Sequence, residues 1–444
     1  MKLFAEPPVT RYTYVNNRLV IFDWASLAYH LFHSSAKYDL PDAEQEINVW
    51  RVKMITRVMD YIALFNPRHV VFALEGKAAW RKAFVEDYYN KHAEVYWNKN
   101  EYYVKADNIL YLVQKGTDGG YMLTKLNIKD AKKLADLKHK PLGEMPEKQR
   151  SMFWSLYTPG GDPIVPSYKG QRKSKPWTFK TDKKVWAKYR EQFAVELAPL
   201  FRARPIQCLR AEGDDIIYST MKQYAGECDD VIIITRDSDM SQISNRNVRI
   251  FNHQTNTFTS MQNPEKFLDE KVLYGDTADN IPGMAFVDQN TGNFKPEKNT
   301  RLSDKGAATL LEKCPNVYEK AKAEGWVDQY NRNRTLIDLS RVPADVQKEI
   351  QEAIDLVPEP KDAAGFERLR FWGVTDMVIG NYLRLQTAGF YAVNSVNSGR
   401  QFDSAMFARA TAEAERPKID IDDSVVTADN IGLDDVYSDI DVPF

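Results

Sequence analysis

The chain of 444 residues contains no apolar run that approaches the roughly 18–20 residues required by a membrane-spanning helix. Its three cysteines, Cys208, Cys228 and Cys314, are odd in number and show no CxxC spacing, which argues against a disulfide framework and a zinc site. The amino terminus lacks the apolar core of a signal peptide. We therefore expect a chain with free thiols that works in a reducing cytoplasm and has no membrane partner.

Neither sign of charge dominates, because 60 Lys and Arg face 62 Asp and Glu, which gives a net charge of −2. The charges are unevenly distributed, however. Residues 417–444 hold eight Asp and one Lys, a charge of −7 that leaves +5 on the rest of the chain. A mildly basic body with an acidic tail is compatible with binding to a polyanion.

Three short apolar runs, each rich in β-branched residues, predict buried strands: 18–23, 69–75 and 229–239. Apolar residues at helical spacing separate the first two runs, and Asn66-Pro67 closes that helix. Strand, helix and strand in this order predict a βαβ unit. The expected fold class is therefore α/β, with a mostly parallel central sheet flanked by helices.

The first two runs end at Asp23 and Glu75, and Asp237 and Asp239 lie just past the end of the third strand. In an open α/β sheet, ligands bind beyond the carboxyl ends of the strands, so we expect these acids to meet there. A helix over 190–204 and a strand at 205–209 would bring three more acids to the same edge. Asp276 and Asp279 are three residues apart, a spacing that places both on one side of a helical turn. The nine acids of the expected cluster are Asp23, Glu75, Glu212, Asp214, Asp215, Asp237, Asp239, Asp276 and Asp279.

Such a cluster cannot remain ionised without cations. Oxygen ligands with little His or Cys indicate Mg²⁺, for which Mn²⁺ can substitute. Two such ions about 3.5–4 Å apart are the usual device for in-line attack on a phosphodiester. A single Asp after a strand is more often a turn former or a helix cap. The number of separate segments that supply acids favours the metal site.

Two stretches interleave Lys and Arg with Trp and Tyr, at 77–106 and 165–190. Cations neutralise phosphates and aromatic faces stack on unpaired bases, so both stretches predict binding to nucleic acid. A solvated amphipathic surface is the alternative. His30 and His33 lie on an expected helix, where core or helix-end positions explain them better than metal binding.

Six motifs in sequence order resemble those of the 5′ nuclease superfamily, which includes flap endonucleases and the 5′→3′ exonuclease domains of bacterial DNA polymerases: IFDWASLAYHLFHS, VFALEGKAAWRKAF, YKGQRKSKP, AEGDDIIYS, ITRDSDMSQI and YGDTADNIPGM. The later YNRNRTLIDLSRVPADV resembles the bacteriophage ribonuclease H branch. The resemblance covers roughly 17–90 and 166–345. It implies a PIN-like nuclease core over 1–275 and a helical DNA-binding domain of helix–hairpin–helix type over 276–415.

The resemblance also implies roles for residues at matching positions. Ligands of a first metal are matched by Asp23, Glu75, Glu212 and Asp214. Ligands of a second metal are matched by Asp237, Asp239 and Asp276, with Asp215 and Asp279 as nearby or water-mediated contributors. The cations that draw the scissile phosphate toward the metals are matched by Arg81, Lys169 and Arg172. Further DNA contacts are implied for Lys82, Tyr168, Lys173, Gly283 and Lys305, with Tyr168 stacking on a terminal base.

The sequence departs from the family pattern in three places. Glu75 stands where the family usually has Asp. Residues 91–165 form an insertion at the place of the family's arch over single strands, and strands around a Gly-Gly turn predict an inserted subdomain there. Because of this insertion, either DYYNKH (87–92) or SYKGQR (167–172) supplies the phosphate-gripping Lys, and distance to Glu212 favours the second. The tight glycine pair of the hairpin is missing, which argues against a bound K⁺.

Residues 416–444 have the composition of a disordered acidic tail. Its end, DDVYSDIDVPF, resembles the tip of bacterial single-stranded-DNA-binding proteins, which docks on replication and repair partners. Binding of such a partner would use Asp439, Asp441, Pro443 and Phe444. The alternative is a tail that only increases solubility.

The sequence thus predicts a monomeric, phage-type 5′ nuclease in the host-cell cytoplasm. It would cut flap or nicked duplexes, as DNA or RNA–DNA hybrid, and remove RNA primers or flaps during replication. Two alternatives compete with this interpretation. One is a haloacid-dehalogenase-type phosphatase with Asp237 as nucleophile, which leaves Glu212 and Asp276 unexplained. The other is a non-catalytic DNA-structure-binding scaffold that recruits partners through its tail.

Overall fold

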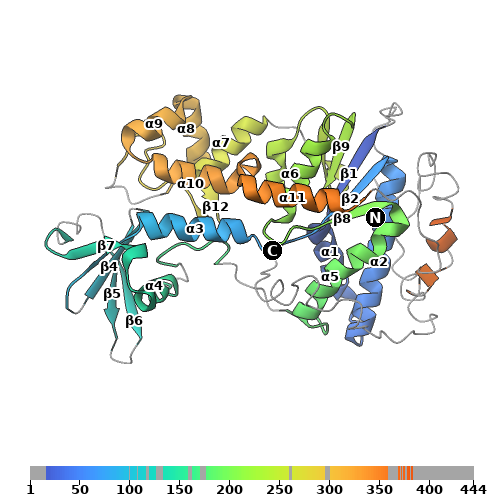
Figure 1. The fold of residues 1–444 in the computed structure, drawn as a ribbon, viewed down its shortest axis with the longest axis horizontal. Coiled ribbons are helices and arrows are strands. Elements are labelled where there is room, and N and C mark those ends of the chain that lie inside the picture. Colours follow the sequence, from blue (N-terminus) through green and yellow to red (C-terminus); the bar gives the residue numbers. More distant parts are fainter. Residues whose placement is uncertain are drawn as a thin grey trace. The chain divides into compact units, whose positions relative to one another are not determined.

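The computed structural model describes residues 17–99, 101–107, 109–116, 120–126, 134–158, 163–170, 177–259, 263–295, 301–358, 369–370, 372, 374–375, 378–380 and 382–383. The chain divides into two compact units, which are described separately. The first unit combines the described residues of 1–77, 176–264 and 344–440, and the second combines those of 78–175 and 265–343 (Figure 1).

The first unit is built on a six-stranded sheet in the order β11–β10–β9–β1–β2–β8. Its strands are β1 (Arg18–Asp23), β2 (His69–Ala73), β8 (Ala203–Ile206), β9 (Asp230–Ile234), β10 (Val248–Asn252) and β11 (Thr257–Phe258). All pairings are parallel except that of β10 with β11. The expected α/β class with a mostly parallel sheet is therefore confirmed, although β8 begins two residues before the expected strand at 205–209.

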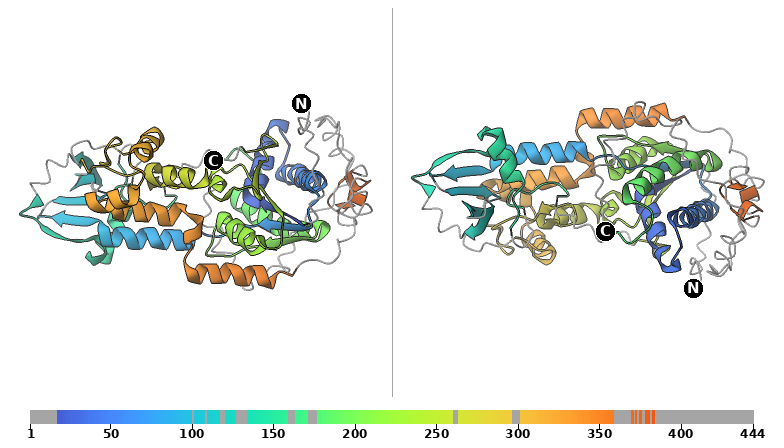
Figure 2. Two further views of the ribbon diagram at one scale, coloured as in Figure 1. Left: turned by 90° about the horizontal axis from the view of Figure 1, so that it is seen from above. Right: turned by 90° about the horizontal axis from the view of Figure 1, so that it is seen from below.

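Helices cover both faces of this sheet. One face carries α1 (Trp24–His33), α2 (Ala43–Phe65) and α5 (Lys183–Leu197), and the other carries α6 (Gly213–Tyr224) and α11 (Ala344–Leu356) (Figure 2). The Trp24 ring stacks on Phe72 of β2 with 4.8 Å between ring centroids, which fixes α1 to the sheet. Among the helices of the described residues, none combines the length and apolar character needed to cross a membrane.

The connection between β1 and β2 shows how the sequence sets these elements. Helix α2 begins after Asp42, whose side chain accepts a hydrogen bond from Gln45 N at 2.8 Å. It ends at Asn66, which adopts the left-handed conformation (φ 46°) directly before Pro67. From β1 the chain moves through β2 to β8 on one side, while β9 and β10 lie on the other. The strand order thus reverses between β1 and β9, a point where ligands of open α/β sheets bind.

The second unit contains an antiparallel sheet in the order β6–β5–β4–β3–β7, which lies within the insertion expected at 91–165. Its strands are β3 (Glu94–Trp97), β4 (Glu101–Ala106), β5 (Ile109–Lys115), β6 (Tyr121–Leu126) and β7 (Lys138–Pro141). The strands expected around the Gly-Gly turn are β5 and β6, which pair as a hairpin. The helices of this unit are α3 (Ala79–His92), α4 (Glu147–Trp154), α7 (Pro264–Tyr274), α8 (Asp304–Lys313), α9 (Val317–Glu324) and α10 (Val327–Ile337).

Candidate active site

The carboxyl ends of the parallel strands bring three acids of the first unit to one edge. Asp23 ends β1 opposite Ala73 of β2, and its neighbour Phe22 lies opposite Ile234 of β9. Glu75 follows β2 by two residues and Asp237 follows β9 by three. Asp23 and Asp237 therefore flank the point at which the strand order reverses.

Asp23 is the most constrained of these acids, since it is only 8% exposed. Its Oδ1 accepts a hydrogen bond from Ser26 N at 3.1 Å and caps α1, and its Oδ2 accepts one from Thr235 Oγ1 at 2.7 Å. Burial raises the pKa of Asp23 from 3.8 to about 7. The two hydrogen bonds oppose this shift, and the negative charges of Asp237 and Glu75 add to it. A cation bound beside these groups would instead lower the pKa of Asp23.

The longer side chain of Glu75 reaches the amino terminus of α6, where its Oε2 lies 3.4 Å from Gly213 N. Backbone hydrogen bonds join the segment after β2 to the segment between β8 and α6. Leu74 N donates to Ile206 O at 2.9 Å, and Lys77 N donates to Leu209 O at 2.9 Å. The backbone thus accommodates a Glu where the family usually has Asp.

The three acids at the start of α6 have different environments. Glu212 and Asp215 form a capping box, in which Glu212 N donates to Asp215 Oδ2 at 3.1 Å. Asp215 is fully buried, so capping explains it without a metal. Asp214 is partly exposed and suits the positive end of the helix dipole.

Asp237 and Asp239 follow β9 in a short 3-10 helix, η5 (Ser238–Ile243). Asp237 is exposed, and its Oδ1 accepts a hydrogen bond from Asp239 N at 2.8 Å. Asp237 N donates in turn to Thr235 Oγ1 at 2.9 Å. Thr235 therefore links Asp23 to Asp237, a role that its position two residues before Asp237 could have indicated.

Glu191 on α5 is a second residue that sequence reasoning missed. It is buried beside Arg190, with which it forms an ion pair. Burial raises the pKa of Glu191, Arg190 opposes the shift, and the charge of Glu75 adds to it. Glu191 therefore lies near Glu75. Its place in an amphipathic helix gave no signal of this.

The donor atoms of this edge are carboxylate and hydroxyl oxygens, which are the ligands that Mg²⁺ and Mn²⁺ prefer. Their chemistry therefore fits a hard divalent cation. Across the part of the chain that the structure describes, however, no three His, Cys, Asp or Glu side chains converge in a ready-made metal site. The donor types fit, but these residues do not form a complete ligand set.

Asp276 and Asp279 belong to the second unit, where the structure corrects the expected helical turn. Gly275–Asp276 form strand β12, which pairs with β13 (Ile281–Pro282). Asp276 Oδ1 accepts hydrogen bonds from Ala278 N at 2.8 Å and Asp279 N at 3.2 Å, and its Oδ2 pairs with Lys271 Nζ at 2.9 Å. This Asx-type turn competes with a helix for the same backbone donors.

A second turn, at 167–170, docks on this one. Tyr168 Oη donates to Asp279 Oδ2 at 2.9 Å, and Lys169 N donates to the Asp279 carbonyl oxygen at 2.9 Å. Tyr168 is only 6% exposed, which corrects the expected stacking on a terminal base, because a buried ring offers no free face. Lys169 is partly exposed and adopts the left-handed conformation (φ 58°).

Arg81 also departs from expectation. It is only 2% exposed, and its Nε donates to Leu336 O at 3.1 Å. A guanidinium this buried bonds the protein itself and is not accessible to a phosphate. The expected role of Arg81 as a phosphate-binding cation is therefore corrected. Lys82 is partly exposed on α3, and Lys305 is exposed in the first turn of α8.

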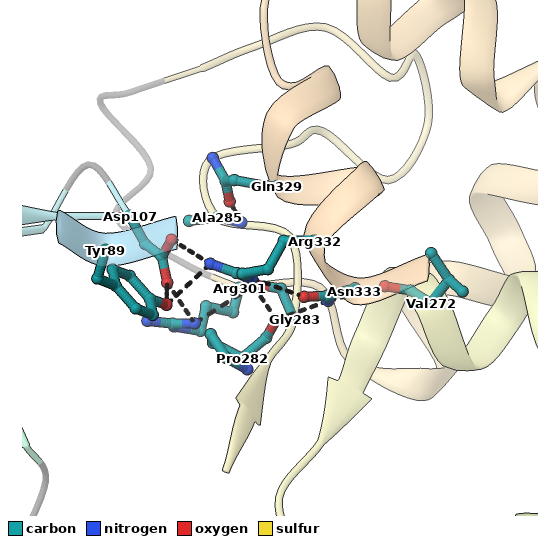
Figure 3. Close-up of polar contacts among 10 residues, drawn as sticks. All are labelled: Tyr89, Asp107, Val272, Pro282, Gly283, Ala285, Arg301, Gln329, Arg332 and Asn333. Atoms are coloured by element: carbon teal, nitrogen blue, oxygen red, sulfur yellow. Dashed lines mark hydrogen bonds and ion pairs between the residues drawn. The ribbon is translucent and has the colours of Figure 1, made fainter. Parts of the chain in front are cut away.

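Side chains of α10 hold the backbone that follows β13 (Figure 3). Arg332 Nη2 and Asn333 Nδ2 donate to Pro282 O at 3.2 and 2.8 Å, and Gln329 Oε1 accepts from Ala285 N at 3.0 Å. Gly283 is buried between them, and a Cβ atom there would lie 2.5 Å from Tyr274 O. Close backbone approach therefore explains Gly283, which the sequence assigned to DNA contact.

Arg332 also reaches the inserted sheet. It forms a buried ion pair with Asp107 in the β4–β5 turn, and its Nη1 donates to Tyr89 Oη at 2.9 Å (Figure 3). Tyr89 Oη donates in turn to Asp107 Oδ2 at 2.7 Å. The inserted sheet is thus joined to α3 and α10 by a hydrogen-bonded charge pair. The remaining expected site residues, Arg172, Lys173, Asp439, Asp441, Pro443 and Phe444, lie outside the described residues.

Comparison with known proteins gives a family for part of the chain. Residues 162–272 match the family described as 5′-3′ exonuclease, N-terminal resolvase-like domain. The 5′-3′ exonuclease of Buchnera aphidicola subsp. Acyrthosiphon pisum is 25% identical over 190 residues, which are 39% of this chain and 66% of that protein. DNA polymerase I of Lactococcus lactis is 32% identical over 212 residues, which are 39% of this chain and 23% of the polymerase. The chain thus spans less than two thirds of these relatives' length.

The likeness to solved structures is distant. The T5 D15 protein co-crystallised with metal ions aligns with a TM-score of 0.41 and 14% identity, over 77% of this chain and 99% of that one. The bacteriophage T5 D15 flap endonuclease in a complex with DNA and metal ions aligns with a TM-score of 0.41 and 15% identity, over 77% of this chain and 99% of that one.

Proposed function

We propose that this chain, which belongs to the 5′ nuclease superfamily, is a metal-dependent nuclease that hydrolyses phosphodiester bonds at or near the 5′ ends of flap or nicked duplexes. The observation that carries the proposal is the position of Asp23, Glu75 and Asp237 at the carboxyl ends of β1, β2 and β9, on either side of the reversal of strand order. The raised pKa of Asp23 reflects burial and negative neighbours, a combination that favours cation binding.

Asp23, Glu75 and Asp237 would hold a divalent cation at this edge, and such a cation would supply a bound water of lowered pKa and stabilisation of the charge that develops on the phosphate. The residues of the chain prepare the site for it. Thr235 donates to the Asp23 carboxylate and accepts from Asp237 N, so one hydroxyl fixes the Asp23 side chain and the backbone of Asp237. Glu75 is held toward the start of α6 by Gly213 N. Lys169 and Arg172 are the proposed phosphate-binding cations.

The finer features of the function rest on the sequence. We propose two Mg²⁺ ions, for which Mn²⁺ can substitute, with Glu212, Asp214, Asp239, Asp276 and Asp279 as further ligands or water-mediated contributors. The proposed role is removal of RNA primers or flaps during DNA replication, by an enzyme of the bacteriophage ribonuclease H branch. We further propose that the acidic Pro-Phe tail binds a replication protein.

A panel of 5′-labelled substrates tests this function. The full chain is incubated with a flap duplex, a nicked RNA–DNA hybrid and an intact single strand, each with Mg²⁺ or with EDTA. We expect short 5′ products that depend on Mg²⁺ and disappear in Asp237→Asn. Asp229→Asn serves as the control, because Asp229 is an exposed acid just before the opposite end of β9. Equal cleavage by wild type and Asp237→Asn would reject the proposed site.

One observation favours a second candidate, a non-catalytic scaffold that binds DNA structures. The described residues do not form a complete metal-ligand set. A scaffold would bind the flap duplex with the same affinity in Mg²⁺ and EDTA and would release no product with either Mg²⁺ or Mn²⁺. The same panel therefore separates the two functions.

A further inference from the structure

Strands β9 and β10 end side by side at the carboxyl edge of the sheet in the first unit. Thr235 N donates to Phe251 O at 3.1 Å, which continues the parallel register of the two strands. Arg236 is the next residue on one side, and His253 follows Phe251 by two residues on the other. The register therefore brings Arg236 and His253 to neighbouring positions. Arg236 is exposed and directly precedes Asp237, whereas His253 is only 2% exposed.

Helix α1 approaches this point with two polar side chains one turn apart. Ser26 Oγ lies 2.9 Å from His253 Nε2, and the ring centroids of His30 and His253 are 5.3 Å apart. His30 is partly exposed. Burial is the main cause that lowers the pKa of His30 to about 4, and the charges of Arg57 and Arg236 add to the shift. Both arginines therefore lie within electrostatic reach of His30.

Helix α2 supplies the second of these arginines. Arg57 Nη1 donates to Asn256 Oδ1 at 3.0 Å, in the turn after β10. Tyr61 Oη donates to the same oxygen at 3.1 Å and to His253 O at 3.4 Å. These bonds orient the Arg57 guanidinium, which is partly exposed. Its Nε and Nη2 make no hydrogen bond to the described residues, so they are available to a ligand.

The two arginines have no acidic partner. Within the described part of the chain, no carboxylate forms an ion pair with Arg57 or Arg236. Two guanidinium groups offer two positive charges and several N–H donors in a geometry that suits phosphate oxygens. A phosphate monoester carries about −1.5 to −2 at pH 7, whereas a phosphodiester carries a single charge. The charge of the pair therefore matches a terminal phosphate better than an internal one.

We infer that Arg57, Arg236 and His30 form a subsite for the 5′-terminal phosphate of the strand that is cut. Asp237 follows Arg236 directly, so a strand end held here lies next to the edge at which the divalent cation is proposed. The inference rests on the proposed function and gives its site a preference for 5′-phosphorylated over 5′-hydroxyl ends. None of the three residues is among the phosphate-binding cations that the sequence resemblance implied.

Binding of nicked duplexes in EDTA tests the inference apart from cleavage. Two duplexes differ only in a phosphate or a hydroxyl at the 5′ side of the nick, and fluorescence anisotropy gives the affinity of the full chain for each. We expect wild type to bind the 5′-phosphorylated nick at least about tenfold more tightly, because charge-assisted hydrogen bonds are the stronger kind. Arg236→Gln should lose this preference. Because Arg236 is exposed, its substitution removes no core contact.

Two further variants and a competitor sharpen the test. Arg236→Lys keeps the charge without the forked donors and should keep part of the preference. Arg246→Gln is the matched control, because Arg246 is an exposed arginine just before the opposite, amino end of β10. It should keep the full preference. Inorganic phosphate, compared with chloride at equal ionic strength, should weaken wild-type binding of the 5′-phosphorylated nick and leave binding of the 5′-hydroxyl nick unchanged.

The results for the subsite and for the nuclease can be separated. Equal affinity of wild type for the two nicks, or a preference that Arg236→Gln retains, would overturn the inference. Mg²⁺-dependent cleavage without a preference for either end would keep the proposed nuclease and reject the subsite. A preference in EDTA that Arg236→Gln loses, without cleavage in Mg²⁺, would keep the subsite and reject the proposed nuclease.

Discussion

A Cβ atom on Gly76 would lie 2.1 Å from the carbonyl oxygen of Ala211, and it would also lie 2.2 Å from that of Cys208. Both neighbours are backbone atoms, so neither can move aside like a flexible side chain. The segment after β2 therefore approaches the segment before α6 backbone to backbone. This approach places Glu75 next to the start of α6, where Glu212 and Asp214 follow.

We expect Gly76→Ala to push these two segments apart and displace Glu75. The predicted effect is a loss of at least about 100-fold in cleavage rate, since a displacement near 1 Å costs on that order. The rate is measured on the 5′-labelled flap duplex at saturating Mg²⁺. Gly226→Ala is the control, because no atom lies within 4 Å of its added Cβ. Similar rates for the two variants would show that the close approach does not position Glu75.

Tyr168 provides a test of positioning against stacking. Its hydroxyl bonds Asp279 at 2.9 Å, a neutral donor to a carboxylate, and such bonds contribute about 1.5–3 kcal/mol. If Tyr168 acts through Asp279, Tyr168→Phe should lower kcat roughly tenfold and leave KM nearly unchanged. A Phe ring can still stack on a base. An unchanged kcat in Tyr168→Phe would therefore support the stacking on a terminal base that the sequence resemblance implied.

The buried pair of Asp107 and Arg332 makes a prediction about stability. Asp107→Asn leaves Arg332 buried without its charge partner, and breaking such a pair typically costs about 3–5 kcal/mol. We expect the free energy of unfolding in urea to fall by that order. Asp87→Asn breaks the exposed Asp87–Lys91 pair on α3 and should have almost no effect. Equal effects of the two variants would mean that Asp107 does not anchor the inserted sheet.

His253 makes a prediction about pH. Burial lowers its pKa to about 3, and His30, Arg236 and Arg57 add to the shift. The unfolded chain binds a proton below pH 6.5, whereas the folded chain does so only near pH 3. The unfolded state therefore holds more protons in this window, and stability is lost as the pH falls from 6.5.

The His253→Gln variant isolates this effect, because Gln cannot titrate and its amide can still meet Ser26 Oγ, which lies 2.9 Å from His253 Nε2. We expect its free energy of unfolding to decline less than that of wild type between pH 6.5 and 4. His139→Gln changes an exposed histidine and should follow wild type. Parallel curves for wild type and His253→Gln would contradict the buried neutral state.

The sequence predicted the strands of the first unit well, because each is a short and strongly apolar run that can be recognised from neighbouring residues alone. The strand at Arg18–Asp23 has the expected bounds, and the acids after β1, β2 and β9 lie at the expected edge. Predictions were wrong where an aspartate made local backbone bonds. Asp276 forms a turn in place of a helix for this reason.

The sequence also did not show which side chains of the expected site are buried. Arg81 and Tyr168 have the residue types of a phosphate cation and a stacking ring, but each is enclosed by residues distant in sequence. Thr235 and Glu191 approach the acids only through the fold. Long-range contacts of this kind leave no periodic or motif-like trace in one sequence.

Mn²⁺ binding, followed by electron paramagnetic resonance, tests most directly whether the carboxyl edge of the sheet holds divalent cations. Wild type, Asp23→Asn and the control Asp229→Asn are titrated at pH 8 after treatment with EDTA and its removal. We predict that wild type and Asp229→Asn bind Mn²⁺ with the same affinity, whereas Asp23→Asn loses at least one bound ion. Equal binding by all three proteins, or no binding by wild type, would contradict a metal site at this edge.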